Sequence, residues 1–163
     1  KEKFIPSFED RAQDILDVVD DYNTDKRLVF GISAGGTAAI SCSNLFSKTF
    51  CVYPALIAIT SQMLKAQNVT IVTGRSDNWT PADQARNFAQ YVECDLHIIN
   101  GYHGFLNPRQ CRDIPDIMSL RNQKLDVPWD HSWTHLNFER GIRLEYNIRS
   151  RLYTEKLFTQ WLT

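Results

Sequence analysis

The sequence predicts an α/β fold in which helices cover both faces of a parallel sheet, and two observations support this. Short apolar runs alternate along the chain with segments of helical spacing, which is the pattern of βαβ units. The connections between these runs are long enough to cross over the sheet, so neighbouring strands are expected to run parallel. With 163 residues the chain suffices for one domain with a hydrophobic core, spanning 1–163.

Each strand is predicted from a short, β-rich apolar run, because such runs suit parallel strands that are covered on both faces. The runs, in chain order, are Leu28–Phe30, Phe50–Tyr53, Val69–Thr73 and Leu96–Ile99. Helices are predicted where apolar residues recur every three or four positions. These segments are Phe8–Tyr22, Thr37–Lys48, Pro81–Glu93 and Arg143–Leu162.

Local signals support two of the helix starts. Ser7 can cap the first helix, since its hydroxyl can accept a hydrogen bond from an N–H of the first turn. Pro81 suits the first turn of the third helix, where a missing N–H costs nothing. Of the connections, Ile57–Gln67 is predicted as a helical or irregular crossover, and Leu106–Asn137 mostly as loop because it contains three prolines.

Charge and hydropathy argue against two classes of partner. The net charge is −1 at pH 7, so the overall charge does not favour nucleic acid. No apolar run approaches the roughly 18 residues that a membrane span needs. We therefore expect neither a nucleic-acid nor a membrane partner. Two sequons, at Asn68 and Asn78, and four cysteines leave cytoplasmic and secreted locations open.

The four cysteines show no C-x-x-C spacing, so neither a zinc ribbon nor a redox motif is expected. Cys42 and Cys51 stand in apolar surroundings and are predicted to be buried thiols. A bridge between Cys94 and Cys111 stays open.

The other three histidines are predicted to have structural rather than chemical roles. His131 and His135, with Asp130, would suit zinc if they lay on a helix, but the nearby Pro128 favours a loop, and no metal is expected. His97 lies inside a predicted strand and is expected to be a packed residue.

Polar residues follow three of the predicted strands. Ser33 comes after the first strand, Asp77 after the third and His103 after the fourth. Ligands bind at the carboxyl ends of the strands in open parallel sheets, so these are the positions to consider for chemistry. His103 can take the proton of Ser33, and the carboxylate of Asp77 can hold the imidazole tautomer and stabilise its developing positive charge.

Ser33 stands in a run of small residues, GISAGG, at the point where the first strand turns into a helix. The three glycines, Gly31, Gly35 and Gly36, are expected to remove side chains where strand and helix would otherwise collide. Ser33 would then be exposed at the head of the helix, and the N–H of Ala34 would face an oxyanion.

Each of these residues also has a plainer interpretation. A glycine-rich turn can hold phosphate, Asp77 can cap the helix that begins near Pro81, and His103 can be a structural histidine. Their occurrence together, in the order Ser, Asp, His at strand ends, favours a catalytic triad. Three aromatic residues near the strand ends are assigned either to an acyl or alcohol pocket or to rim packing: Tyr53, Trp79 and Tyr102.

These motifs resemble the α/β-hydrolase superfamily, most closely its dienelactone hydrolase-like branch. The matching segments are GISAGG, TGRSDNWTPADQARNF, GYHGF and EYNIRSRLYTEKLFTQWL. The resemblance spans Phe8 to Thr163, is poorest over Asn107–Arg143, and implies the C-terminal half of an α/β-hydrolase fold. Dienelactone hydrolases use a cysteine nucleophile, whereas Ser33 is typical of the serine esterases and peptidases of the superfamily.

The resemblance implies an activity. Ser33 would attack a small-molecule carboxylic ester and form an acyl-enzyme, with Asp77 and His103 completing the triad and no cofactor required. The HGF context and the short crossovers favour an esterase, while a serine peptidase stays open.

The resemblance also implies elements that this chain does not supply. The superfamily's sheet has more strands than the four predicted, and the second oxyanion donor comes from a loop with no counterpart in the sequence. The edge of the strand Leu28–Phe30 would be bare and prone to association. We therefore expect an N-terminal segment or a second chain to cover it. The alternative is a catalytically incompetent hydrolase-like domain used for binding or assembly.

Overall fold

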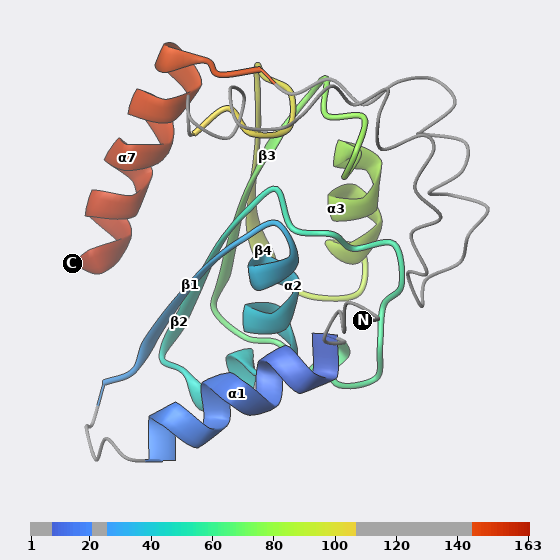
Figure 1. Cartoon of the computed structure of the whole chain (residues 1–163), viewed down its shortest axis with the longest axis vertical. Coiled ribbons are helices and arrows are strands. Elements are labelled where there is room, and N and C mark those ends of the chain that lie inside the picture. The colour runs from blue at the N-terminus through green and yellow to red at the C-terminus, as the bar shows by residue number, and fades with distance from the viewer. Residues whose placement is uncertain (1–7, 21–25, 107–144) are drawn as a thin grey trace, which may run out of the picture.

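A computed structural model describes residues 8–20, 26–106 and 145–163 of the chain. Its strands form a sheet in which chain order and spatial order coincide, β1-β2-β3-β4, and each neighbouring pair is parallel. The strands are β1 (Leu28–Ile32), β2 (Lys48–Val52), β3 (Val69–Gly74) and β4 (Cys94–Ile99). Figure 1 shows helices on both sides of this sheet, so the predicted fold class is confirmed.

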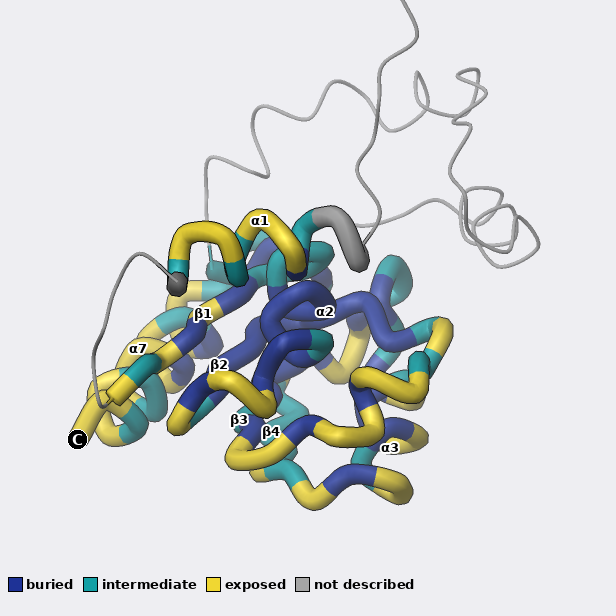
Figure 2. Tube along the Cα trace, turned by 90° about the horizontal axis from the view of Figure 1, so that it is seen from below, coloured by how far each residue is buried: buried dark blue, intermediate teal, exposed yellow. Residues whose placement is uncertain are grey.

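Three helices cover one face of the sheet. They are α1 (Phe8–Asp20), α2 (Ala34–Ser41) and α3 (Ala82–Phe88), and α1 packs across α2. The core between them and the sheet contains Ile40 of α2, Phe88 of α3 and Ile71 of β3, each fully buried. Figure 2 shows α2 almost wholly buried, while α1 is exposed along its outer side.

The other face is covered by α7 (Ile148–Leu162). Its side chains Phe158 and Trp161 meet Phe50 of β2 edge-on, with ring centroids 5.4 and 5.5 Å apart. Phe30 of β1 packs against Phe158 at 5.1 Å, yet it is still 45% exposed. Burying the apolar area of these rings, at about 25 cal/mol per Å², helps to attach α7 to the sheet.

The second helix is shorter than the sequence predicts. The prediction ran to Lys48, but α2 ends at Ser41, a 3₁₀ turn η1 (Ser43–Leu45) follows, and Lys48 already belongs to β2. Serine and asparagine after Ile40 are weak helix formers, because their side chains compete for backbone hydrogen bonds. The chain must also leave the helix before Ser47 to reach the sheet. The Ser47 N–H donates to the Arg27 carbonyl at 2.7 Å, and this bond begins the pairing of β2 with β1.

The remaining helical predictions are right in type and less exact in extent. The first helix ends at Asp20, and the third ends at Phe88 instead of Glu93. The crossover from 57 to 67 contains one 3₁₀ turn, η2 (Met63–Lys65), which buries Met63. In the last helix the side chain of Asn147 accepts the Ser150 N–H at 3.1 Å, which sets the start of α7. Ser7, Arg143 and the predicted loop from 107 to 137 lie outside the described residues.

Candidate active site

Ser33 occupies a strained turn between β1 and α2. Its backbone angles are φ 53° and ψ −123°, outside the regions that residues with a side chain usually adopt. Three backbone bonds hold the turn: the Ser33 N–H donates to the Val52 carbonyl at 2.9 Å, and the Ser33 carbonyl accepts the N–H groups of Gly36 at 2.9 Å and Thr37 at 3.2 Å. The turn therefore presents the serine side chain at the carboxyl edge of the sheet.

Of the three neighbouring glycines, Gly31 is required by space and Gly36 allows close packing. A Cβ on Gly31 would lie 2.4 Å from the Gly35 carbonyl oxygen, and one on Gly36 would lie 3.1 Å from the Pro54 side chain. A Cβ on Gly35 would meet nothing within 4 Å. The expected steric role is thus met by Gly31 and, less strictly, by Gly36, and the prediction for Gly35 is wrong because a Cβ there would collide with no atom.

Asp77 lies in the loop after β3 and organises that loop itself. Its Oδ1 accepts the backbone N–H groups of Trp79 at 2.9 Å and Thr80 at 2.8 Å. Both donors precede α3, whose N-cap residue Pro81 has no side-chain cap bond, so Asp77 does not cap this helix. The loop is tied to the end of β4, because Arg75 N donates to the Ile99 carbonyl at 2.7 Å.

His103 follows β4 and joins the two other residues. Its Nε2 lies 3.1 Å from the Oγ of Ser33, and its Nδ1 lies 2.8 Å from Oδ2 of Asp77. The side chains of His103 and Asp77 are 7% and 0% exposed. The structure therefore brings together three residues 70 and 26 positions apart in the chain, within hydrogen-bonding distance. His103 and Asp77 are buried, whereas Ser33 is partly exposed.

The helix start beside Ser33 offers a donor. Among the described residues the N–H of Ala34, the first residue of α2, has no protein acceptor. The unpaired N–H groups and the dipole at a helix N-terminus favour negative charge. The N–H of Ala34 is therefore a donor that could bind a negatively charged oxygen beside Ser33.

The predicted pocket aromatics are distributed unequally around the imidazole. The ring of Tyr53 lies 4.4 Å from that of His103 and that of Trp79 lies 5.0 Å from it, as centroid distances. Tyr53 is only 1% exposed and packs against His103 in the interior, whereas Trp79 and Tyr102 are half-buried. Sequence reasoning found both neighbours from their place near strand ends, but it could not tell the buried one from the accessible one.

Other candidates from the sequence lie away from this site. His97 on β4 bonds Asp95 at 2.9 Å and the hydroxyl of Tyr153 at 3.2 Å. Cys42 and Cys51 are buried free thiols as predicted, and Cys94 is a free thiol as well. Burial raises the pKa of the Cys42 thiol to about 11 and that of the Cys51 thiol further.

Several predictions fall on residues that are not described. They concern Cys111, Asp130, His131 and His135. Within the described ranges no helix is both long and apolar enough to cross a membrane. The described His, Cys, Asp and Glu side chains do not gather in threes around a possible metal position.

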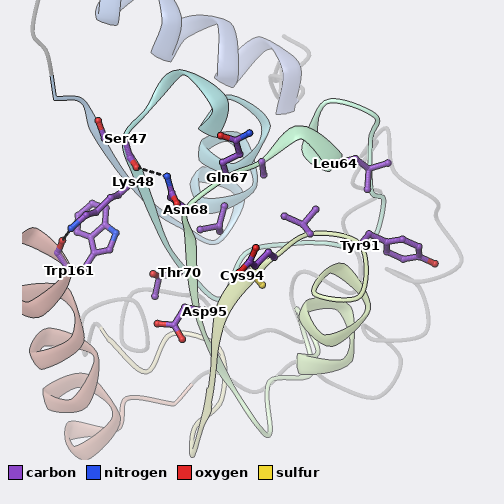
Figure 3. A pocket seen from close by; sticks show the side chains of 14 residues that line it. Ser47, Lys48, Leu64, Gln67, Asn68, Thr70, Tyr91, Cys94, Asp95 and Trp161 are labelled. Carbon is purple, nitrogen blue, oxygen red and sulfur yellow. Dashed lines mark hydrogen bonds between the residues drawn. The ribbon is translucent and has the colours of Figure 1, made fainter.

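A hollow of about 950 Å³ lies at the opposite edge of the sheet, where β2, β3 and β4 begin. Figure 3 shows Trp161 and Lys48 on one side of it and Tyr91 on the other, with Asp95 between them. Lys48 Nζ donates to the Trp161 carbonyl at 2.9 Å, and the Asn68 side chain donates to the Ser47 carbonyl at 3.1 Å. Because ligands of open parallel sheets bind at the carboxyl ends, this hollow is not the candidate active site.

Comparison with known proteins bears on the fold. No protein-family model and no curated protein matches this sequence. The structure is similar to a predicted CIB-like hydrolase from Thermoplasma acidophilum, with a TM-score of 0.53 and 21% identity, over 63% of this chain and 55% of that one. It is also similar to a monoacylglycerol lipase from Paleococcus ferrophilus, with a TM-score of 0.50 and 14% identity, over 65% of this chain and 70% of that one.

This chain spans about 55% of the length of the Thermoplasma acidophilum protein. The match and the parallel four-stranded sheet agree on one architecture. The chain has part of an α/β-hydrolase fold.

Proposed function

We propose that the chain is a serine hydrolase domain that cleaves carboxylic esters through an acyl-enzyme formed on Ser33. The observation that carries the proposal is the continuous relay from Ser33 Oγ through the imidazole of His103 to Asp77, with steps of 3.1 and 2.8 Å. Both distances lie within the range over which protons pass between catalytic groups, about 2.6–3.2 Å.

Each residue has a role in the proposed reaction. Ser33 attacks the ester carbonyl while Nε2 of His103 takes its proton, and the same nitrogen then protonates the leaving alcohol. Asp77 holds the proton-bearing Nδ1 and balances the imidazolium charge. Ala34 N–H stabilises the negative oxygen of the tetrahedral intermediate. Water deacylates the enzyme by the reverse sequence of proton transfers.

Acyl esters are the proposed substrate class. One structural neighbour is named as a monoacylglycerol lipase, which acts on such an ester. The half-buried Trp79 beside His103 provides an apolar wall for an acyl or alcohol group. Within the superfamily we place the chain in the dienelactone hydrolase-like branch, on the motifs around its three candidate residues and with serine in place of cysteine.

The proposal is tested by covalent labelling with a fluorophosphonate probe, read by intact mass and peptide mapping. We expect one adduct on the wild-type chain, located on Ser33, and none on S33A. Ser61, which is exposed in the crossover before β3, supplies the matched control. S61A should label like the wild type. An unlabelled wild-type chain would refute the enzymatic proposal.

A second candidate function is a binding or assembly domain without turnover. It is favoured because, among the described residues, we assign only the N–H of Ala34 as an oxyanion donor, and loss of one such donor costs about 10²–10³ in turnover. Labelling of Ser33 without hydrolysis of p-nitrophenyl acetate would support this alternative. Hydrolysis of an aminoacyl p-nitroanilide in preference to the ester would indicate a serine peptidase instead.

We further propose that a polypeptide segment covers the free edge of β1. Among the described strands β1 lies at one edge of the sheet, and its Leu28 and Phe30 are 41% and 45% exposed. The first structural neighbour contains a large part of chain that this protein does not match. A segment that adds a parallel strand beside β1 would satisfy its backbone groups and bury both side chains.

A further inference from the structure

The hydroxyl of Thr80 lies at the centre of the candidate site without an assigned role. Its Oγ1 is 2.9 Å from Asp77 Oδ2, 3.1 Å from His103 Nδ1 and 3.2 Å from the Tyr53 carbonyl oxygen. Thr80 is 3% exposed, so water does not compete for these contacts. A buried hydroxyl must satisfy its hydrogen-bonding capacity with the groups around it.

Counting protons determines the direction of these bonds. When Nε2 of His103 accepts the proton of Ser33, Nδ1 is the nitrogen that already carries hydrogen. The Thr80 oxygen therefore turns a lone pair towards Nδ1, and its single proton is left for Asp77 or Tyr53. The carboxylate is both the nearer and the charged acceptor, and hydrogen bonds to charged acceptors are stronger.

With this arrangement the carboxylate of Asp77 is fully used. Oδ1 accepts the N–H groups of Trp79 and Thr80, and Oδ2 accepts the Nδ1–H of His103 and the Thr80 hydroxyl. A carboxylate offers about four acceptor positions. Removing the Thr80 hydroxyl would leave one acceptor position of Asp77 without a donor in a buried site. The removal would also free the imidazole of His103 and the carboxylate of Asp77 to rotate relative to each other.

We propose that Thr80 is a positioning residue, whose hydroxyl bridges Asp77 and His103 and fixes the imidazole for proton transfer from Ser33. The proposal rests on the proposed hydrolase function. Under this proposal Thr80, which stands directly before Pro81, acts in the reaction in addition to leading into α3. Valine, which has nearly the same shape as threonine but no hydroxyl, removes the bridge alone.

The experiment compares the full chain with T80V, T80S and T80A, using kcat and KM for p-nitrophenyl acetate. We expect T80V and T80A to lose about tenfold or more in kcat with KM little changed, because one hydrogen bond to a charged group is removed. T80S keeps the hydroxyl and should stay within about threefold of the wild type. Equal kcat in T80V and wild type, or equal losses in T80S and T80V, would overturn the proposal.

A second readout does not depend on turnover. The Nδ1–H proton of His103, held by Asp77 and Thr80, should give a low-field proton signal in the wild type and T80S that is broadened or lost in T80V. The same signal in all three proteins would overturn the role of Thr80. Failure of the wild type to react with the fluorophosphonate overturns the hydrolase proposal instead, and the proton signal still decides the role of Thr80.

Discussion

Replacing Gly31 by alanine tests whether close backbone approach builds the turn that carries Ser33. The added Cβ would lie 2.4 Å from the Gly35 carbonyl oxygen, 2.6 Å from its carbon and 2.7 Å from the Gly36 Cα. All three are backbone atoms and cannot rotate away, so β1 and α2 must separate. Overpacking of this kind typically costs about 1–3 kcal/mol, and we expect the upper end here.

Alanine at Gly35 is the matched control, because its Cβ would meet nothing within 4 Å and it lies in the first turn of α2. Thermal unfolding followed by circular dichroism compares the two. A loss of about 3 kcal/mol lowers Tm by about 6–12 °C in a domain of this size. G35A should unfold at or above the wild-type temperature, since alanine favours helix by up to about 1 kcal/mol over glycine.

The same pair of variants tests the link from the turn to the relay. Separation of β1 and α2 in G31A moves Ser33 Oγ away from His103 Nε2, and fluorophosphonate labelling should slow accordingly. The reasoning is refuted if G31A and G35A unfold at the same temperature. It is also refuted if G31A is destabilised as expected while Ser33 labels at the wild-type rate.

Three further predictions follow. H103Q should slow fluorophosphonate labelling of Ser33 by about 10²–10⁴-fold, because no base remains to take the proton of Ser33. The rate is measured by quenching the reaction at set times and reading the intact mass, and an undiminished rate would contradict the role of His103 as base. Since burial raises the pKa of Cys42 to about 11, its reactive thiolate is scarce at lower pH. Its alkylation by iodoacetamide should therefore be slow at pH 8 and rise steeply towards pH 11, and fast alkylation of the folded chain at pH 8 would contradict this. L28K should reduce self-association of the isolated chain in light scattering, because it places a charge on the exposed edge strand. L45K should not, since Leu45 is comparably exposed but belongs to η1 and not to a strand. Equal effects of the two substitutions would contradict an association edge at β1.

Tertiary structure decided several features that local sequence left open. The length of α2 depends on where β2 must start beside β1, not on helix propensity alone. The burial of Tyr53 beside His103 depends on the packing of Phe105 against it, with the ring centroids of Tyr53 and Phe105 5.1 Å apart. The bridging position of Thr80 was hidden in the sequence because the D-x-x-T-P spacing suits a helix start as well as a proton relay.

The sequence by itself determined the order of the elements and the residues that converge at one edge of the sheet. Apolar runs in β-rich composition specify strands locally, and parallel strands place their carboxyl ends together, so Ser33, Asp77 and His103 were found from position alone. Which glycine has no room for a side chain, which aromatic is buried and which hydroxyl lies between Asp77 and His103 were decided by tertiary structure. Those properties are distances between segments far apart in the chain, and they follow from packing rather than from any local preference.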